Sequence, residues 1–255
     1  MTEYSTPEAA RSTIPVGKRM GLLETAVQKL FTRPVRVNTI EDLGEKFRMV
    51  TLDGDALRGV DWTPGDKIQL QFGGWVQRTY TPLDWNPIQG RTRILVYMHG
   101  DGPGSQWARC LRTGDACLLF GPRRSIDLTK LQSSAFVFGD ESSLGLVAAL
   151  DSVAPGPIRL QTSLEISVSN DTLAVIKALR LNKAHITVRT ESDAHLSEVE
   201  ARALGLLHAH SATSFVLTGK ATSVQRIRQF LRHHRVGASQ FQNKAYWAPG
   251  KKGLD

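Results

Sequence analysis

The character of the sequence changes near Leu131, and this change constrains the fold more than any other feature. Before Leu131, short β-like runs are separated by turn signals such as Asp53-Gly54 and Gly121-Pro122. Six such runs lie at residues 35–37, 47–52, 67–72, 77–81, 93–98 and 116–120. Their spacing predicts an antiparallel β-barrel interrupted by one short helix at 105–111, with Ser105 as its N-cap.

After Leu131, strand-like and helical runs alternate four times. The strands are expected at 134–139, 158–166, 185–188 and 214–219, and the helices at 142–152, 172–181, 196–208 and 221–233. We expect Asn170 or Asp171 to cap the second of these helices. This alternation predicts a parallel sheet with helices on both faces, and hence a β + α/β protein. The predicted division is an arm at 1–33, with a short amphipathic helix at 21–31, a barrel at 34–132 and an α/β part with a C-terminal tail at 133–255.

Composition narrows the class of protein. The hydrophobic fraction of 41% and the charged fraction of 22% are ordinary for a globular chain. Apolar stretches stay below the roughly 18 residues that a membrane helix needs. The N-terminus is polar and has no apolar core typical of a signal peptide, which favours a cytoplasmic protein without integral membrane association. Cys110 and Cys117 are too few for a disulfide framework and are expected to be buried thiols. With neither a CxxC nor an HExxH motif, no protein-bound metal is expected.

The net charge of +8 favours an anionic partner. A nucleic acid is the weaker choice, because the basic residues are not interleaved with aromatic ones on a single motif. We interpret the basic clusters as solvated faces, some of which would line a cleft for anions; they are Arg123, Arg124, Arg226, Arg228, Arg232, His233, His234 and Arg235.

The tract from Arg78 to Pro82 combines a cation, an aromatic ring and a hydroxyl on one extended segment. Arg78 and Tyr80 point to the same face of a strand. Arginine can fork onto a pyrophosphate, tyrosine can stack on a flavin ring, and Thr81 can hydrogen-bond the ring near its reactive nitrogen. The alternative is an ordinary edge strand with a surface arginine.

The run from His99 to Ala108 is typical of a strand end, a glycine-rich turn and a helix start. The turn formed by Gly102, Pro103, Gly104 and Ser105 opens the helix, and the free backbone N–H groups and the helix dipole there would attract phosphate. His99 would contact the same ligand. Together with the Arg78 tract, this pattern suits a flavin dinucleotide; the alternative is an ordinary capped helix with Trp107 in the core.

Two further motifs close the candidate site. Asp140 and Glu141 follow a buried strand, at the edge where parallel sheets bind ligands, and their charge favours a neutral or cationic group such as nicotinamide over phosphate. The alternative is acidic N-capping of the next helix. At the C-terminus, Trp247 with Lys251 and Lys252 would supply stacking and charge, or would form a packed aromatic anchor with a solvated tail.

In this order, these motifs resemble the siderophore-interacting protein family, ferric-siderophore reductases of the ferredoxin-reductase superfamily. The resemblance covers residues 34–250 and rests on Arg78-x-Tyr80-Thr81-Pro82, the segment from His99 to Ala108, Gly121-Pro122, Gly139-Asp140-Glu141-Ser142, and Tyr246-Trp247 with Gly250. The sequence departs from the family pattern at Leu83, Gly145, Lys220 and Ala248.

The resemblance implies an FAD-binding barrel, an NAD(P)H-binding-like α/β domain, and flavin-mediated reduction of ferric siderophores with release of Fe(II). It implies that Arg78, Tyr80, Thr81, His99 and the turn at Gly102–Ser105 hold FAD. Asp140 and Glu141 would lie near the nicotinamide of NADH or NADPH, and Lys251 or Lys252 would attract an anionic chelate. Some members take electrons from ferredoxin instead, and the sequence leaves the donor open.

Two alternatives stay open beside the reductase. The first is a flavoprotein of the same fold that passes electrons to another acceptor, such as a partner electron carrier. The second is a siderophore-binding protein without enzymatic activity, which would take up no flavin. The identity of the siderophore is not readable from the sequence, because the cofactor carries the chemistry and the chelate site has no motif of its own.

Overall fold

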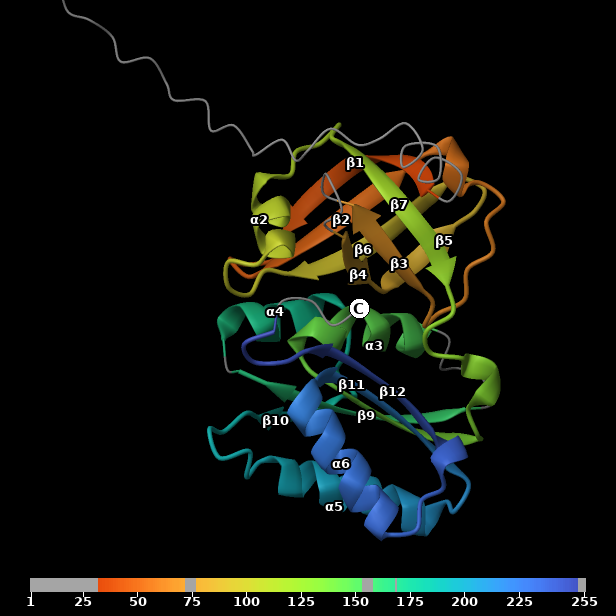
Figure 1. Cartoon of the computed structure of the whole chain (residues 1–255), viewed down its shortest axis with the longest axis vertical. Helices are drawn as coiled ribbons and strands as arrows, with labels where there is room; N and C mark the ends of the chain where they lie inside the picture. Colours follow the sequence, from red (N-terminus) through yellow and green to blue (C-terminus); the bar gives the residue numbers. More distant parts are fainter. Residues whose placement is uncertain (1–31, 72–76, 153–157, 168, 252–255) are drawn as a thin grey trace, which may run out of the picture.

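The computed structural model describes residues 32–71, 77–152, 158–167 and 169–251, which form an antiparallel sheet followed by a parallel one (Figure 1). The predicted β + α/β class is therefore confirmed. The predicted helix at 21–31 and most of the N-terminal arm lie outside the described residues. No helix in the described ranges is long and apolar enough to cross a membrane.

The antiparallel sheet has seven strands in the order β4-β3-β7-β1-β2-β6-β5. They are β1 (Thr32–Asp42), β2 (Phe47–Asp53), β3 (Lys67–Gln71), β4 (Gln77–Tyr80), β5 (Pro82–Asn86), β6 (Arg91–Tyr97) and β7 (Ala116–Arg123), with η1 (Asp55–Leu57) after β2 and α2 (Pro103–Cys110) after β6. The two outermost strands, β4 and β5, are separated along the chain by Thr81 alone, so the edges of the sheet are brought together there. Buried Val50, Leu70 and Leu119 belong to the apolar core inside this barrel.

Strand β5 was not predicted. It begins at Pro82, which cannot donate a ladder hydrogen bond, and prolines are tolerated at the first residue of a strand on a sheet edge. Its buried residues are Pro82 and Leu83, so Leu83, one of the departures from the family pattern, is a buried apolar residue.

The parallel sheet has the order β10-β9-β8-β11-β12, a doubly wound topology that reverses direction between β8 and β11. Its strands are β8 (Ser134–Gly139), β9 (Arg159–Ile166), β10 (His185–Val188), β11 (Thr213–Lys220) and β12 (Phe241–Trp247). The helices are α3 (Leu144–Ser152), α4 (Asn170–Ala178), α5 (Leu196–Ala209) and α6 (Ala221–His233), with short turns η2 (Leu128–Lys130), η3 (Glu141–Ser143) and η4 (Ala238–Gln240). Helices α3 and α4 lie between the sheet and the barrel, and α5 and α6 cover the far face (Figure 1).

The barrel and the α/β part share one apolar cluster. Phe47 from β2 and Tyr97 from β6 pack with Leu144 and Leu146 of α3 and with Val137 of β8. The rings of Phe47 and Tyr97 are stacked with centroids 4.8 Å apart. Because this cluster is buried and continuous across both parts, it fixes the barrel against α3.

A polar contact joins the two parts beside this cluster. The carboxylate of Asp171 in α4 accepts hydrogen bonds from the backbone N–H groups of Glu45 (2.8 Å) and Lys46 (3.1 Å) in the β1–β2 turn. Gly44 has a φ of +76°, and a Cβ there would lie 2.3 Å from Asp171 Oδ1, so this turn needs glycine. The prediction that Asn170 or Asp171 caps this helix is wrong: Ser169 caps α4 by accepting from the Thr172 N–H at 3.1 Å.

Two other expectations are corrected. Cys117 is buried as predicted, but Cys110 is exposed because it falls on the last turn of α2, away from the barrel core. Helix α2 begins at Pro103 with Gly102 as its N-cap, so Ser105 is not the cap. Proline is favoured at the first helical position, since its missing N–H would have no intrahelical partner there.

We expect replacement of Asp171 by alanine to lower the free energy of unfolding by about 1–2 kcal/mol, because two backbone N–H groups lose a charged acceptor. Urea denaturation would measure the change. The control is Glu191→Ala, which removes an exposed carboxylate and should stay within about 0.5 kcal/mol of the parent. Equal stability of both variants would show that the Asp171 contact contributes nothing.

Candidate functional site

The glycine-rich turn before α2 packs directly against β4. A Cβ at Gly104 would lie 3.2 Å from the hydroxyl of Tyr80 and 3.3 Å from Cγ of Arg78. Glycine at this position therefore lets the start of α2 approach both side chains. The structure thus brings together Arg78, Tyr80 and the turn, which were predicted from separate motifs.

The N-terminus of α2 is left without a side-chain cap. Gly102 stands at the cap position, and no side-chain hydrogen bond is made there. Ser105 is buried inside the first turn, and its hydroxyl donates to the carbonyl of His99 at 3.1 Å. This bond ties the turn to the end of β6, while the backbone N–H groups of the first helical turn stay available for an anion.

The charge of Arg78 has no carboxylate partner among the described residues. Its guanidinium donates to the carbonyl of Gln77 at 2.6 Å and is half-buried. Burial raises the pKa of Tyr80 well above its ordinary value, against the lowering effect of the Arg78 charge. Tyr80 is therefore a neutral ring at physiological pH, and it lies beside Trp107 with ring centroids 6.3 Å apart.

Aromatic rings connect the barrel to the C-terminal strand. The ring of His99 lies 5.1 Å from that of Tyr97 and 6.1 Å from that of Trp247, measured between centroids. Loss of solvation lowers the pKa of His99, although the charge of Glu141 opposes this, so the imidazole is neutral near pH 7. Tyr246, next to Trp247, hydrogen-bonds Thr81, and burial raises the pKa of Tyr246 to about 12.

Asp140 is the buried carboxylate at the switch point of the parallel sheet. Its side chain is fully buried, and it accepts hydrogen bonds from the Ser142 N–H (2.9 Å), the Ser142 hydroxyl and the Trp247 indole N–H (2.7 Å). Burial raises the pKa of Asp140 to about 6, although these hydrogen bonds pull it back. The capping interpretation of Asp140 is confirmed, since it is the N-cap of η3.

The end of β11 is shaped around Asp140. Gly219 has a φ of +101°, and a Cβ there would lie 2.6 Å from the Asp140 carboxyl carbon. No other residue type fits both the backbone conformation and the space. Gly145, another departure from the family pattern, lies at the start of α3, where a Cβ would approach the Thr81 carbonyl to 3.0 Å.

Glu141 does not face an open site. It is 2% exposed and pairs with Arg189 at 2.8 Å, and it accepts from the Ser167 N–H at 2.6 Å. Arg189 also donates to the Glu165 carbonyl at 3.2 Å and lies over the Trp247 ring with its guanidinium carbon 6.0 Å from the centroid. Glu141 therefore pairs with a cationic side chain of the protein, Arg189, and its charge is not directed at a ligand.

Sequence reasoning missed Arg189 and the residues beneath it. Arg189 follows β10 directly, as Asp140 follows β8, so the carboxyl-end rule for parallel strands could have found it. Glu165 and His195 give no such signal, because they lie 30 residues apart in the chain. They form a buried pair of 2.7 Å between Nε2 of His195 and the Glu165 carboxylate.

The remaining predicted residues lie near the end of β12. Trp247 is half-buried as the last residue of β12, and Lys251 is exposed four residues later. Lys252 lies outside the described residues. Gly104 packs against Arg78 and Tyr80, and Ser105 ties the same turn to His99. Trp247 lies near the ring of His99 and donates to Asp140, while its neighbour Tyr246 hydrogen-bonds Thr81. Whether they bind FAD or substrate stays a prediction.

Comparisons with known proteins identify related sequences. Residues 74–126 match the family described as the siderophore-interacting FAD-binding domain, and residues 132–250 match the siderophore-interacting protein family. The two matches together cover about two thirds of the chain. A curated relative, the mycobactin import ATP-binding/permease protein IrtA of Mycolicibacterium smegmatis, is 26% identical over 188 residues. That match covers 69% of this chain and 20% of the relative, so the chain spans about one fifth of that protein's length.

Two solved structures illustrate the fold. The siderophore-interacting protein SipS from Aeromonas hydrophila is 20% identical with a TM-score of 0.68, and the match covers 87% of this chain and 93% of SipS. A ferredoxin NADP+ reductase from Neisseria gonorrhoeae with bound FAD and NADP is 14% identical with a TM-score of 0.64, and covers 84% and 98% of the two chains. At these identities the likeness establishes a ferredoxin-reductase-like fold.

We expect the stability of the protein to report the titration of Asp140. Because its folded-state pKa is raised above the value in the unfolded chain, the folded protein loses stability as the pH rises through about 6. Relative to Asp140→Asn, which does not titrate, the parent should lose about 1 kcal/mol between pH 5 and pH 7.5. Urea unfolding at both pH values measures this difference, and a constant difference would contradict the raised pKa.

Proposed function

The chain belongs to the siderophore-interacting protein family, and from this premise we propose that it is a cytoplasmic FAD-dependent ferric-siderophore reductase. Its substrate would be an anionic ferric chelate, from which iron is released as Fe(II). The observation that carries the proposal is the packing of the α2 turn against Arg78 and Tyr80, inside the stretch that matches the FAD-binding domain.

The residues at this place fit FAD. Arg78 has no carboxylate partner in the described part of the chain, and the N-terminus of α2, which has no side-chain cap, offers backbone N–H groups; together they suit a pyrophosphate. Tyr80 offers a neutral ring for stacking. Thr81 offers a hydroxyl between β4 and β5, the two edge strands of the barrel sheet. Bound FAD supplies hydride acceptance and single-electron transfer to the ferric chelate.

The C-terminal strand would form the far wall of the flavin site. Asp140 holds the indole of Trp247 in one orientation, and Trp247 in turn lies against the neutral His99 ring. Tyr246 hydrogen-bonds Thr81 from the same strand. These contacts would exclude water from one side of the site. Lys251, exposed beyond Trp247, would attract an anionic chelate together with Lys252, its neighbour in the sequence.

For the electron donor we propose three candidates: NADH, NADPH or ferredoxin. The ferredoxin NADP+ reductase from Neisseria gonorrhoeae, which carries FAD and NADP, supports a nicotinamide donor through its fold. Because Asp140 and Glu141 are both occupied inside the protein, we propose that they shape the wall beside the nicotinamide. The same fold similarity favours the second candidate function, a flavoprotein that serves another electron acceptor.

The first test is a visible absorption spectrum after incubation with FAD and removal of free cofactor. We expect retained flavin bands, bleaching under anaerobic NADH or NADPH, and formation of Fe(II) from ferric catecholate, measured with a colour-forming Fe(II) chelator. Bleaching without Fe(II) formation would favour another acceptor. A protein that binds the chelate but retains no flavin would support the non-enzymatic binding protein.

Arg78→Ala should weaken FAD binding roughly ten- to a hundred-fold, because a charge-assisted contact to the pyrophosphate is lost. Flavin fluorescence titration measures the dissociation constant. The control is Arg58→Ala, which removes an exposed arginine of the barrel that pairs with Asp55 and should leave the affinity unchanged. An unaltered affinity in Arg78→Ala would remove Arg78 from the phosphate site.

Replacing both Lys251 and Lys252 by alanine should raise KM for an anionic ferric chelate several-fold without altering the flavin content. The expected change comes from lost long-range attraction, so it should shrink as the salt concentration rises. Steady-state kinetics at low and high salt measure both effects. A KM equal to that of the parent at low salt would exclude the lysines from substrate binding.

A further inference from the structure

A groove of about 330 Å³ lies between α6 and β12, on the face of the parallel sheet that points away from the barrel. Arg228 and Arg232 of α6 line one end, and Ala221 and Val224 line the other. Asn243 and Ala245 of β12 line the opposite wall. The groove is separate from the flavin site, because the whole sheet and α3 stand between it and the barrel (Figure 1).

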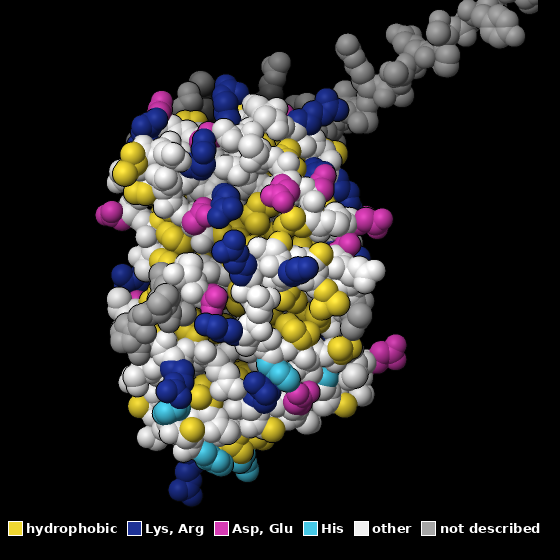
Figure 2. All heavy atoms as spheres, turned by 180° about the vertical axis from the view of Figure 1, so that it is seen from behind, with side chains coloured by type: hydrophobic (Ala, Val, Ile, Leu, Met, Phe, Trp, Pro, Cys, Tyr) yellow, Lys and Arg dark blue, Asp and Glu magenta, His cyan; other side chains and the backbone are white. Residues whose placement is uncertain are grey.

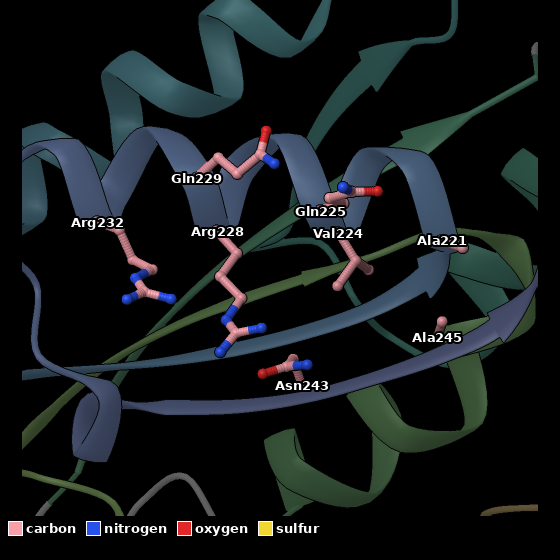
Figure 3. Close-up of a pocket in the computed structure, with 8 residues that line it drawn as sticks. All are labelled: Ala221, Val224, Gln225, Arg228, Gln229, Arg232, Asn243 and Ala245. Carbon is pink, nitrogen blue, oxygen red and sulfur yellow. The ribbon is translucent and has the colours of Figure 1, made fainter.

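The charge in this groove is not neutralised. Neither α6 nor β12 contains an acidic residue. Arg226 of the same helix makes a two-point contact with Glu200, but no ion pair among the described residues involves Arg228 or Arg232. Figure 3 shows the guanidinium groups of Arg228 and Arg232 extending from α6 toward β12, with Asn243 beneath Arg228.

Arg228 is partly desolvated where it stands. Its guanidinium carbon lies 5.9 Å from the centre of the Phe241 ring, and its Nε is buried with no hydrogen-bond partner in the described part of the chain. A buried donor without a partner favours a ligand that accepts a hydrogen bond. On the face of the molecule turned away from the viewer in Figure 1, Figure 2 shows lysine and arginine side chains interspersed with aspartate and glutamate.

The groove runs beside an open sheet edge. Strand β12 is the last strand of its sheet, and within the described residues it pairs only with β11. The side chain of its Gln242 exchanges hydrogen bonds with the Asp127 backbone, on the side opposite Asn243. An unpaired edge presents backbone N–H and C=O groups that accept an additional extended strand.

The spacing of the arginines matches a strand. Arg228 and Arg232 are four residues apart on a helix, which places them about 6 Å apart along its axis. Side chains two residues apart on one face of a strand are separated by about 6.8 Å. A strand laid along β12 therefore brings successive groove-facing side chains to successive turns of α6.

We propose that this groove binds an extended acidic segment of a partner protein, which adds to β12 as a further strand. Two acidic side chains, two residues apart, pair with Arg228 and Arg232. The next groove-facing side chain is apolar and packs on Val224, Ala221 and Ala245. A small anion such as phosphate would use the arginines but leave the apolar end and the strand edge unoccupied.

Binding of a labelled peptide to the full-length protein tests this proposal. The probes are the seven-residue peptide Thr-Glu-Thr-Glu-Thr-Val-Thr and its reverse, since either strand direction is open, with the isomer Glu-Glu-Thr-Thr-Thr-Thr-Val as the control. We expect fluorescence anisotropy to detect one of the alternating peptides, and the isomer to bind at least ten-fold more weakly.

The matched variants separate the groove from general charge attraction. The double variant R228Q/R232Q should lower the affinity roughly ten-fold or more. The control K177Q/K183Q makes the same charge change at exposed lysines elsewhere in the α/β part and should change the affinity less than two-fold. Equal effects of the two double variants, or none in R228Q/R232Q, would overturn the proposal.

Hydrogen exchange distinguishes strand addition from an ionic contact. The alternating peptide should slow backbone amide exchange in residues 241–247 of the parent protein but not of R228Q/R232Q. Phosphate should cause no such protection. Binding without protection of β12, or saturable phosphate binding with no peptide binding, would contradict strand addition. Flavin retention by R228Q/R232Q should equal that of the parent, which keeps this test independent of the proposed reductase.

Discussion

The buried carboxylate of Asp140 is the contact on which the arrangement of the site depends. It stands at the end of β8, where the doubly wound sheet changes direction, and it reaches the indole of Trp247 at the end of β12. It also begins the turn into α3 through Ser142, and α3 packs against the barrel. One acid therefore links two strands of the parallel sheet to the helix that supports the barrel. Burial of the charge opposes folding, and the missing Cβ of Gly219 leaves the space in which this carboxylate is held.

Strands with continuous apolar runs were predictable, whereas two of the four edge strands, β5 and β12, were missed. The runs at 134–139 and 214–219 match β8 and β11 within one residue, because both strands are buried on both faces and carry almost only apolar or small side chains. Strand β12 was missed because it mixes polar with aromatic residues and has no fully buried position. Its existence depends on pairing with β11, which is tertiary information. The same holds for β5, whose pairing with β6 outweighs its initial proline.

The candidate site shows a similar division. Motifs that are local in sequence were readable: the turn before α2 and the Arg78 tract meet as expected, because a strand end and a helix start position their own residues. The contact between distant residues was not predicted, because Glu141 and Arg189 are 48 residues apart and no local motif joins them. The misassigned cap has a physical cause. Serine and glycine both tolerate the cap position, and Pro103 selects Gly102 because proline fits the first helical position.

The net charge of +8 is informative only when the paired arginines are separated from those without an acidic partner among the described residues. On the barrel side of the parallel sheet, Arg189 is neutralised by Glu141 and surrounded by acceptors, so its charge serves the fold. On the other side, Arg226 is likewise held by Glu200, whereas Arg228 and Arg232 on the same helix pair with no acidic residue that the structure describes. Helix α6 thus uses one arginine to attach itself to α5 and presents two others beside an open strand. Unpaired charge next to an unpaired strand edge offers ionic and backbone partners to the same anionic strand, and this coincidence distinguishes the α6–β12 groove from a merely solvated basic surface.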